Sequence, residues 1–258
     1  MEKGVSRLKR IVSLCISLLL LGFLDTSSLA QAAARRAPDA SDFAMPKNPR
    51  VLIIGSSVAA GWKDQKGGYL KRTFDKLSMT TGVHYHLISQ AVPGQGAARL
   101  NPFYPQWLME AHPQIVVLAW GILDDLYEHT PLPAFSEMIR QQISLALQRH
   151  AVVFLVTTPI SKASYTQYQD LQPIYINTER QVAYSFRDPN VYVFNVFDQM
   201  KRYLAEHGQT YVPYMADGWH PNSRGHALAS RILFRDIMHQ FGRSPISFVM
   251  GPKSHLAE

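Results

Sequence analysis

The sequence is almost without cysteine. Its 258 residues include one, Cys15, which lies inside an apolar run near the N-terminus. If that run is removed as a signal segment, the remaining chain has no thiol, which excludes disulfide bonds, cysteine nucleophiles and cysteine-ligated metals. We therefore expect the folded domain to be stabilised by its core alone, with no metal and no cofactor.

Long apolar runs and dense positive charge are also missing. The apolar run 11–24 is shorter than the roughly 20 residues that a membrane-spanning helix needs. The net charge is +7, but no dense run of Lys and Arg follows Arg36, so no nucleic-acid partner is expected. The mild positive charge is compatible with association with an anionic cell wall or membrane surface.

The N-terminal segment has the pattern of an export signal. Basic residues precede the apolar run, and Ala30-Gln31-Ala32 offers a cleavage site with small residues. We expect residues 1–32 to be a signal peptide cleaved after Ala32, which would place the protein in the cell envelope or outside the cell. Retention of the run as an uncleaved anchor is the alternative.

The rest of the chain alternates between apolar runs and stretches long enough for helices. Residues 33–49 show no apolar period and are expected to be a linker. The expected strands are 51–54, 84–89 (a weaker pattern), 114–120, 151–157 and 191–196. The expected helices are 67–81, 103–111, 133–149, 166–187 and 223–241. This alternation predicts a three-layer α/β domain over residues 50–241, with a parallel sheet of about five strands. Residues 242–258 are expected to form a loosely ordered tail, apart from a few apolar side chains that pack back on the domain.

Residues with chemical potential follow the ends of the expected strands. Ser57 comes after the first strand, Gly94 after the second and Gly121 after the third, while Asp217 and His220 precede the last helix. In an open parallel sheet such loops meet at one edge, where ligands bind. A histidine three residues after an aspartate can be oriented by the carboxylate on one ring nitrogen and accept a proton on the other. The pattern therefore predicts a serine hydrolase with Ser57, Asp217 and His220 as its triad.

These loops resemble the motif blocks of the SGNH/GDSL hydrolase family. The first block reads Gly-Ser-Ser-Val-Ala-Ala-Gly at 55–61, the second Ala-Val-Pro-Gly at 91–94 and the fifth Asp-Gly-Trp-His-Pro at 217–221. The resemblance covers about 50–241 and implies a flavodoxin-like three-layer fold with a metal-free esterase site. It also implies Ser57 as nucleophile and an oxyanion hole formed by the backbone N–H groups of Ser57 and Gly94.

Two positions depart from the family pattern. Ser56 replaces the aspartate of the first block, and Leu123 replaces the asparagine of the third block, which reads Gly-Ile-Leu-Asp at 121–124. Leucine has no side-chain donor for the oxyanion, and loss of one such donor lowers turnover by about 10²–10³-fold. The candidates for a substitute donor are Gln90, Gln95 and Asn101.

The remaining expectations concern the substrate. Trp62 and Trp219, with Leu123, are expected to wall a pocket, where an indole can also stack on a sugar ring; core packing is the alternative. The sequence predicts a secreted esterase for small acyl esters, with acetyl as the expected acyl group, of a carbohydrate or cell-wall glycan. One alternative is a lipid-directed esterase such as a lysophospholipase. Another is a non-catalytic glycan-binding or scaffold protein, for which Leu123 is the reason.

Overall fold

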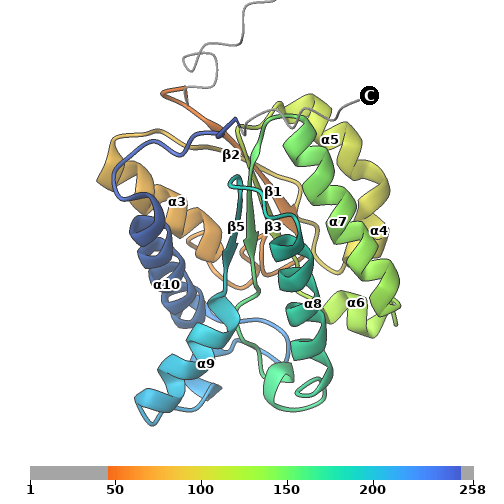
Figure 1. The fold of residues 1–258 in the computed structure, drawn as a ribbon. Helices are drawn as coiled ribbons and strands as arrows, with labels where there is room; N and C mark the ends of the chain where they lie inside the picture. The colour runs from red at the N-terminus through yellow and green to blue at the C-terminus, as the bar shows by residue number, and fades with distance from the viewer. Residues whose placement is uncertain (1–45, 251–258) are drawn as a thin grey trace, which may run out of the picture. The chain divides into compact units, whose positions relative to one another are not determined.

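The computed structural model describes residues 46–250, so the expected signal peptide, nearly all of the expected linker and residues 251–258 lie outside the described part. Five strands form one parallel sheet in the order β2-β1-β3-β4-β5, which confirms the predicted α/β fold (Figure 1). The strands are β1 (Arg50–Gly55), β2 (His86–Ser89), β3 (Ile115–Ala119), β4 (Val152–Val156) and β5 (Val191–Phe194).

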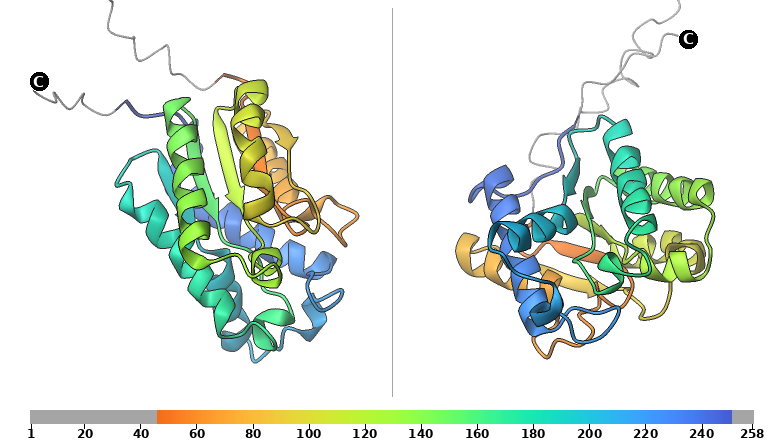
Figure 2. Two further views of the ribbon diagram at one scale, coloured as in Figure 1. Left: turned by 90° about the vertical axis from the view of Figure 1, so that its right-hand side faces the viewer. Right: turned by 90° about the horizontal axis from the view of Figure 1, so that it is seen from below.

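Helices cover both faces of this sheet. The α-helices are α3 (Gly68–Thr81), α4 (Ala97–Leu100), α5 (Tyr104–Ala111), α6 (Leu123–Tyr127), α7 (Leu132–Gln148), α8 (Leu171–Ser185), α9 (Val196–Glu206) and α10 (Ser223–Phe241). The described residues also form three short 3₁₀ turns: η2 (Asn101–Phe103), η3 (Ala163–Tyr165) and η4 (Val212–Tyr214). Helix α10 packs on α3 and α9 along one face, and α7 packs on α4, α5 and α8 along the other (Figures 1 and 2).

Burial along the strands explains which of them the sequence predicts well. Every residue of β3 and β4 is buried, and so is β1 after its first residue, because both faces of these central strands are covered. The edge strands β2 and β5 are only partly buried. An edge strand needs fewer apolar residues, which is why 84–89 carries the weaker pattern.

The structure corrects the predicted strand 191–196. Strand β5 ends at Phe194 and α9 begins at Val196, because the Asn195 side chain caps the helix by accepting a hydrogen bond from the Asp198 N–H at 3.1 Å. The sequence analysis therefore missed α9. It also missed α4 and α6, which are too short to show a helical period.

The segment that follows α10 packs back on the domain. Ile246 is buried, the ring of Phe248 lies edge-on to that of His150, and the Val249 N–H donates to the side chain of Asn190. Within residues 46–250, no helix is both long and apolar enough to cross a membrane.

Candidate active site

The predicted site residues lie where the strand order reverses. From β1 the chain crosses to β2 on one side and later returns to β3 on the other, and ligands bind at such a switch point in parallel sheets. Ser57 follows the end of β1 by two residues. Helix α6 and the beginning of α8 contact each other at the same end of the sheet (Figure 1).

The structure brings Ser57, His220 and Asp217 together. Ser57 Oγ lies 3.0 Å from His220 Nε2 across 163 positions of sequence. On the other side of the ring, His220 Nδ1 lies 2.9 Å and 3.0 Å from the two carboxylate oxygens of Asp217. With Nδ1 protonated, the ring donates to the carboxylate and Nε2 is free to accept the proton of the serine hydroxyl.

Asp217 also organises its own loop. Its Oδ1 accepts hydrogen bonds from the backbone N–H groups of Trp219 and His220, both at 2.8 Å. Partial burial opposes ionisation, but these two N–H groups and the His220 imidazole outweigh it and hold the pKa of Asp217 below its ordinary value. The carboxylate therefore stays charged, as a group that supports an imidazolium must.

The two adjacent serines have different surroundings. Ser56 is 1% exposed, and its hydroxyl lies near the Asp124 carboxyl without forming a full hydrogen bond. Burial raises the pKa of Asp124, and the nearby Ser56 hydroxyl partly opposes that rise. Ser57 is 7% exposed and faces His220. The geometry therefore favours Ser57 over Ser56 as the nucleophile.

The loop after β2 runs beside the loop that carries Ser57. The Val92 N–H donates to the carbonyl of Gly55 at 3.1 Å, so Gly94 and Ser57 each follow this hydrogen bond by two residues. Gly94 has a φ of 74°, in the left-handed region that favours glycine. This arrangement places the peptide N–H groups of Gly94 and Ser57 in neighbouring turns.

Leu123 stands at the head of α6 and lines a small cavity beside Ser57. None of the three amides considered as substitutes is among the residues that line this cavity. The structure engages Asn101 with α7 instead: its amide donates to Gln141 and its carbonyl oxygen accepts from Gln142. The backbone N–H groups of Gln90 and Gln95 pair with carbonyls of Ile53 and Val92.

The cavity beside Ser57 is small and is lined by both polar and apolar side chains. Its volume is about 10 Å³, the space of about one ordered water molecule. Its lining combines residues that follow β1, β3 and β4 with one from the Asp217 loop: Ser56, Ser57, Val58, Gly121, Leu123, Asp124, Thr158, Pro159, Ser161, Gln172 and Trp219.

Aromatic side chains surround one wall of this cavity. The Trp219 ring packs edge-on against Tyr127, with centroids 5.9 Å apart, and against Tyr168 at 6.3 Å. Tyr127 is 67% exposed, so its ring is presented to solvent beside the cavity. Trp62, by contrast, does not line the cavity; it is exposed, and Lys63 lies over its ring.

A second histidine of the C-terminal region, His226, supports the serine turn. It is fully buried in α10, where its Nδ1 accepts from the Tyr69 N–H at 3.2 Å and its Nε2 donates to the Trp62 carbonyl at 3.1 Å. Burial lowers the pKa of His226, which favours the neutral ring that this pair of contacts requires. The Trp62 N–H in turn donates to the Ser57 carbonyl, so His226 links α10 to the serine turn through Trp62.

Three buried carboxyl groups lie behind the site. Burial raises the pKa of Asp124, raises that of Asp125 to about 6 and raises that of Glu179 well above its ordinary value. Asp125 accepts from the N–H groups of Ala97 and Ala98, which ties the loop after β2 to α6. Within residues 46–250 these groups do not gather with others into a cluster able to hold a metal ion.

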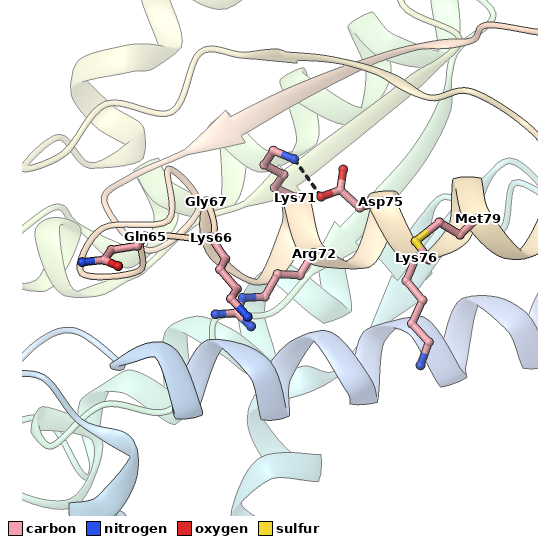
Figure 3. A pocket seen from close by; sticks show the side chains of 8 residues that line it. All are labelled: Gln65, Lys66, Gly67, Lys71, Arg72, Asp75, Lys76 and Met79. Carbon is pink, nitrogen blue, oxygen red and sulfur yellow. Dashed lines mark hydrogen bonds and ion pairs between the residues drawn. The ribbon is translucent and has the colours of Figure 1, made fainter.

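A larger surface hollow of about 590 Å³ lies along α3 (Figure 3). Its charged groups are largely paired, Lys71 with Asp75 at 2.7 Å and Arg72 with the buried Asp64 at 2.6 Å. None of its lining residues belongs to the Ser57, His220 and Asp217 group. We therefore place the chemistry at the smaller cavity, where these three residues meet.

The sequence analysis missed Gln172 and Tyr127 as residues of the site. Gln172 shares the buried face of α8 with Ile176, Glu179 and Ala183, at helical spacing. A polar residue in that apolar stripe was the available signal. No sequence signal indicated Tyr127, because its position depends on how the short helix α6 packs against the Asp217 loop.

A family model described as GDSL-like Lipase/Acylhydrolase family matches residues 53–228. No curated protein matches this chain in sequence.

Several of the similar solved structures are of one enzyme. An acetylxylan esterase of Geobacillus stearothermophilus is 16% identical, with a TM-score of 0.61 over 76% of this chain and 96% of the esterase. Three catalytic mutants of it have a serine, an aspartate or a histidine replaced by alanine. A lipase/acylhydrolase of Enterococcus faecalis is 17% identical, with a TM-score of 0.60 over 74% of this chain and 96% of that chain. At these identities the likeness establishes the fold.

Proposed function

Because the chain belongs to the GDSL-like lipase/acylhydrolase family, we propose that it is a serine ester hydrolase acting on small acyl esters of a carbohydrate or cell-wall glycan. Acetyl is the expected acyl group. Ser57 acts as nucleophile, His220 as general base and acid, and Asp217 as the group that orients the imidazole. The observation that carries this proposal is the continuous hydrogen-bonded line from Ser57 Oγ through His220 to Asp217.

The reaction proceeds in two halves. Ser57 Oγ attacks the ester carbonyl carbon while His220 Nε2 takes the hydroxyl proton, and Asp217 stabilises the imidazolium. The tetrahedral intermediate then collapses, the carbon–oxygen bond to the alcohol breaks, and His220 returns the proton to the departing oxygen. Water next attacks the acyl-serine with His220 as base, which releases the carboxylic acid and restores the Ser57 hydroxyl.

The oxyanion of the intermediate binds to backbone N–H groups in this proposal. The turns of Ser57 and Gly94 are neighbours because the loop after β2 pairs with the end of β1. Two fixed donors aimed at the developing charge stabilise the transition state more than the ground state. Leu123 adds no donor, so these two N–H groups would carry most of the stabilisation.

The cavity and its aromatic wall support a small acyl group on a larger alcohol. A cavity of about 10 Å³ can enclose a small acyl group but not a long acyl chain, which favours small acyl esters as substrates. The exposed Tyr127, braced by Trp219, offers the kind of aromatic face on which a sugar ring stacks. The Geobacillus enzyme of similar fold is named for esters of this kind, acetylated xylan.

The test is hydrolysis of chromogenic esters from acetate to long acyl chains by the purified protein. The Ser57→Ala variant is the blank and Ser56→Ala is the matched control. We expect activity to be highest on acetate, to survive in Ser56→Ala and to vanish in Ser57→Ala. No activity above the Ser57→Ala blank on any ester would favour the non-catalytic glycan-binding alternative, and a preference for long chains would favour the lipid-directed one.

Export remains part of the proposal. It is based on the basic residues, apolar run and small-residue cleavage site of positions 1–32. Mass spectrometry of the protein expressed with its N-terminus should find a mature chain beginning at Ala33. A chain that keeps residues 1–32 would favour the uncleaved anchor.

A further inference from the structure

Gln172 is an unpaired polar group in the wall of the catalytic cavity. It lies in the first turn of α8 and is 1% exposed, yet neither its Nε2 nor its Oε1 has a hydrogen-bond partner. It lines the same cavity as Ser57 and Leu123. A buried amide without partners destabilises a fold, so an amide in this state is expected to serve something that enters the cavity.

A second buried glutamine shows how this fold treats an amide with a structural role. Gln142 is fully buried, its Oε1 accepts from the Trp120 indole at 2.9 Å, and its Nε2 donates to Asn101 at 3.0 Å. Both ends of that amide are satisfied within the protein. Gln172 differs from Gln142 in this respect, although the two are equally inaccessible to bulk solvent.

The strand order indicates which part of an ester would occupy the cavity. Apart from Trp219, which lies in the loop of His220, the cavity residues follow β1, β3 and β4, whereas Gly94 follows β2, on the opposite side of β1. When the carbonyl oxygen of the ester points at the Gly94 N–H, it points away from the cavity. The cavity can then hold one of the other two substituents of the carbonyl carbon. The alcohol oxygen must face His220 Nε2 to receive its proton, so the enclosed cavity receives the acyl substituent.

We propose that this cavity is the acyl pocket and that Gln172 sets its specificity, admitting two-carbon acyl groups, accepting a hydroxyl on the second carbon and rejecting a third carbon. This inference rests on the esterase function proposed above and specifies its acyl group. A hydroxyl at the end of the acyl group can pair with the Gln172 amide, which offers both a donor and an acceptor. A methyl group in the same place would leave the amide buried and unpaired.

Glycolyl and propionyl esters form the sharpest substrate pair for this proposal. They have nearly the same shape and differ in a hydroxyl against a methyl at the end of the acyl group. A site built to hydrogen-bond a substrate hydroxyl rejects the analogue that lacks it far more strongly than an apolar site distinguishes two alkyl groups. We expect the protein to prefer the glycolate by about 10²-fold or more in kcat/KM, after division by the rate of each ester with hydroxide.

The experiment compares the hydrolysis of phenyl acetate, glycolate, propionate and butyrate by the wild-type protein and by the Gln172→Met and Gln172→Ala variants. Methionine keeps the length of the side chain without its amide, and we expect it to bring the glycolate-to-propionate ratio to within about tenfold of unity. Alanine enlarges the pocket, and we expect it to raise the rate on butyrate relative to acetate. A wild-type ratio near unity, or a ratio that Gln172→Met leaves unchanged, would overturn the proposal.

Thermal unfolding separates a specificity role from a structural one. Removing an unpaired amide should leave the Tm of Gln172→Met equal to or above that of the wild type, whereas Gln142→Met should lower it. An equal loss in both variants would show that Gln172 is held by the fold, and would overturn the proposal. Hydrolysis of acetate without selectivity would refute this inference alone, and failure to hydrolyse any ester would refute the proposed esterase function as well.

Discussion

Ser56 Oγ lies directly over Gly121, so that a Cβ built on Gly121 would be only 2.6 Å from it. This contact joins the loop after β1 to the loop after β3, immediately beside the Ser57 turn. The Ser56 hydroxyl lies between Gly121 and the Asp124 carboxyl, whereas His220 Nε2 pairs with the hydroxyl of Ser57. Its position is that of a packing residue in the site.

The first prediction follows from this position of Ser56. Ser56→Ala should retain most of the esterase activity, because Ser57 keeps its contact with His220. Ser56→Asp should lower the free energy of unfolding by about 3 kcal/mol, because it buries a second carboxylate beside Asp124. Denaturant unfolding and ester hydrolysis measure both effects. If Ser56→Asp were as stable as Ser56→Ala, the two side chains at positions 56 and 124 would not be in contact.

The second prediction concerns the orientation of the imidazole. Asp217→Asn keeps the shape of the side chain but removes the negative charge that supports a protonated His220. We expect kcat to fall by about 10³–10⁴-fold with little change in KM, as for the aspartate of a serine-protease triad. Steady-state kinetics give the two constants, and an unchanged Tm would show that the loop still forms. A loss of less than tenfold would mean that His220 is oriented by another group.

The third prediction concerns the missing oxyanion donor. Leu123→Asn should raise kcat by about tenfold or more if its amide reaches the oxyanion, since one such donor is worth about 10²–10³-fold. It should also lower the free energy of unfolding by about 1–3 kcal/mol, because Leu123 is buried. Leu123→Ala is the control, because it adds space without a donor. Equal rates in Leu123→Asn and the wild type would show that another group already fills the role.

The sequence alone was enough to predict the parallel sheet and the meeting of Ser57, His220 and Asp217. The central strands are continuous apolar runs, and the catalytic candidates stand directly after strands or before a capped helix, where topology leaves them little freedom. The prediction of a strand over 191–196 was wrong at its end, because an apolar residue such as Val196 suits a strand as well as a helix. The Asn195 side chain, which caps α9, decides in favour of the helix. The hydrophobic pattern of these residues alone does not distinguish a strand from a capped helix.

The walls of the cavity were harder to predict than its catalytic residues. Trp219 is part of the Asp217 motif, so its place was fixed once that loop was recognised. Trp62 follows Ser57 by five residues, but the turn places its ring in solvent while its carbonyl accepts a hydrogen bond from His226. Gln172 enters the cavity only because α8 packs against the end of β4, a tertiary contact with no motif of its own.

The last prediction concerns pH and the buried carboxyl group of Glu179. Both of its oxygens are without partners, and burial, with Asp125 nearby, raises its pKa well above its ordinary value. Below the ordinary pKa of glutamate the group is protonated in the folded and the unfolded chain alike. As the pH rises above that value, the unfolded chain loses the proton first, so this group makes the folded state progressively less stable until its own raised pKa is passed.

Glu179→Gln removes this dependence, because the amide resembles the protonated acid at every pH. We expect the variant and the wild type to have similar Tm values near pH 4, and the variant to become the more stable one as the pH rises toward 8. A gain of 1 kcal/mol corresponds to about 2–4 °C for a domain of this size. The exposed Glu206→Gln is the matched control and should follow the wild type throughout. Parallel Tm curves for Glu179→Gln and the wild type would mean that Glu179 is ionised in the folded protein, and that the positive charge of Arg180, which lowers the pKa of Glu179, offsets the effect of burial.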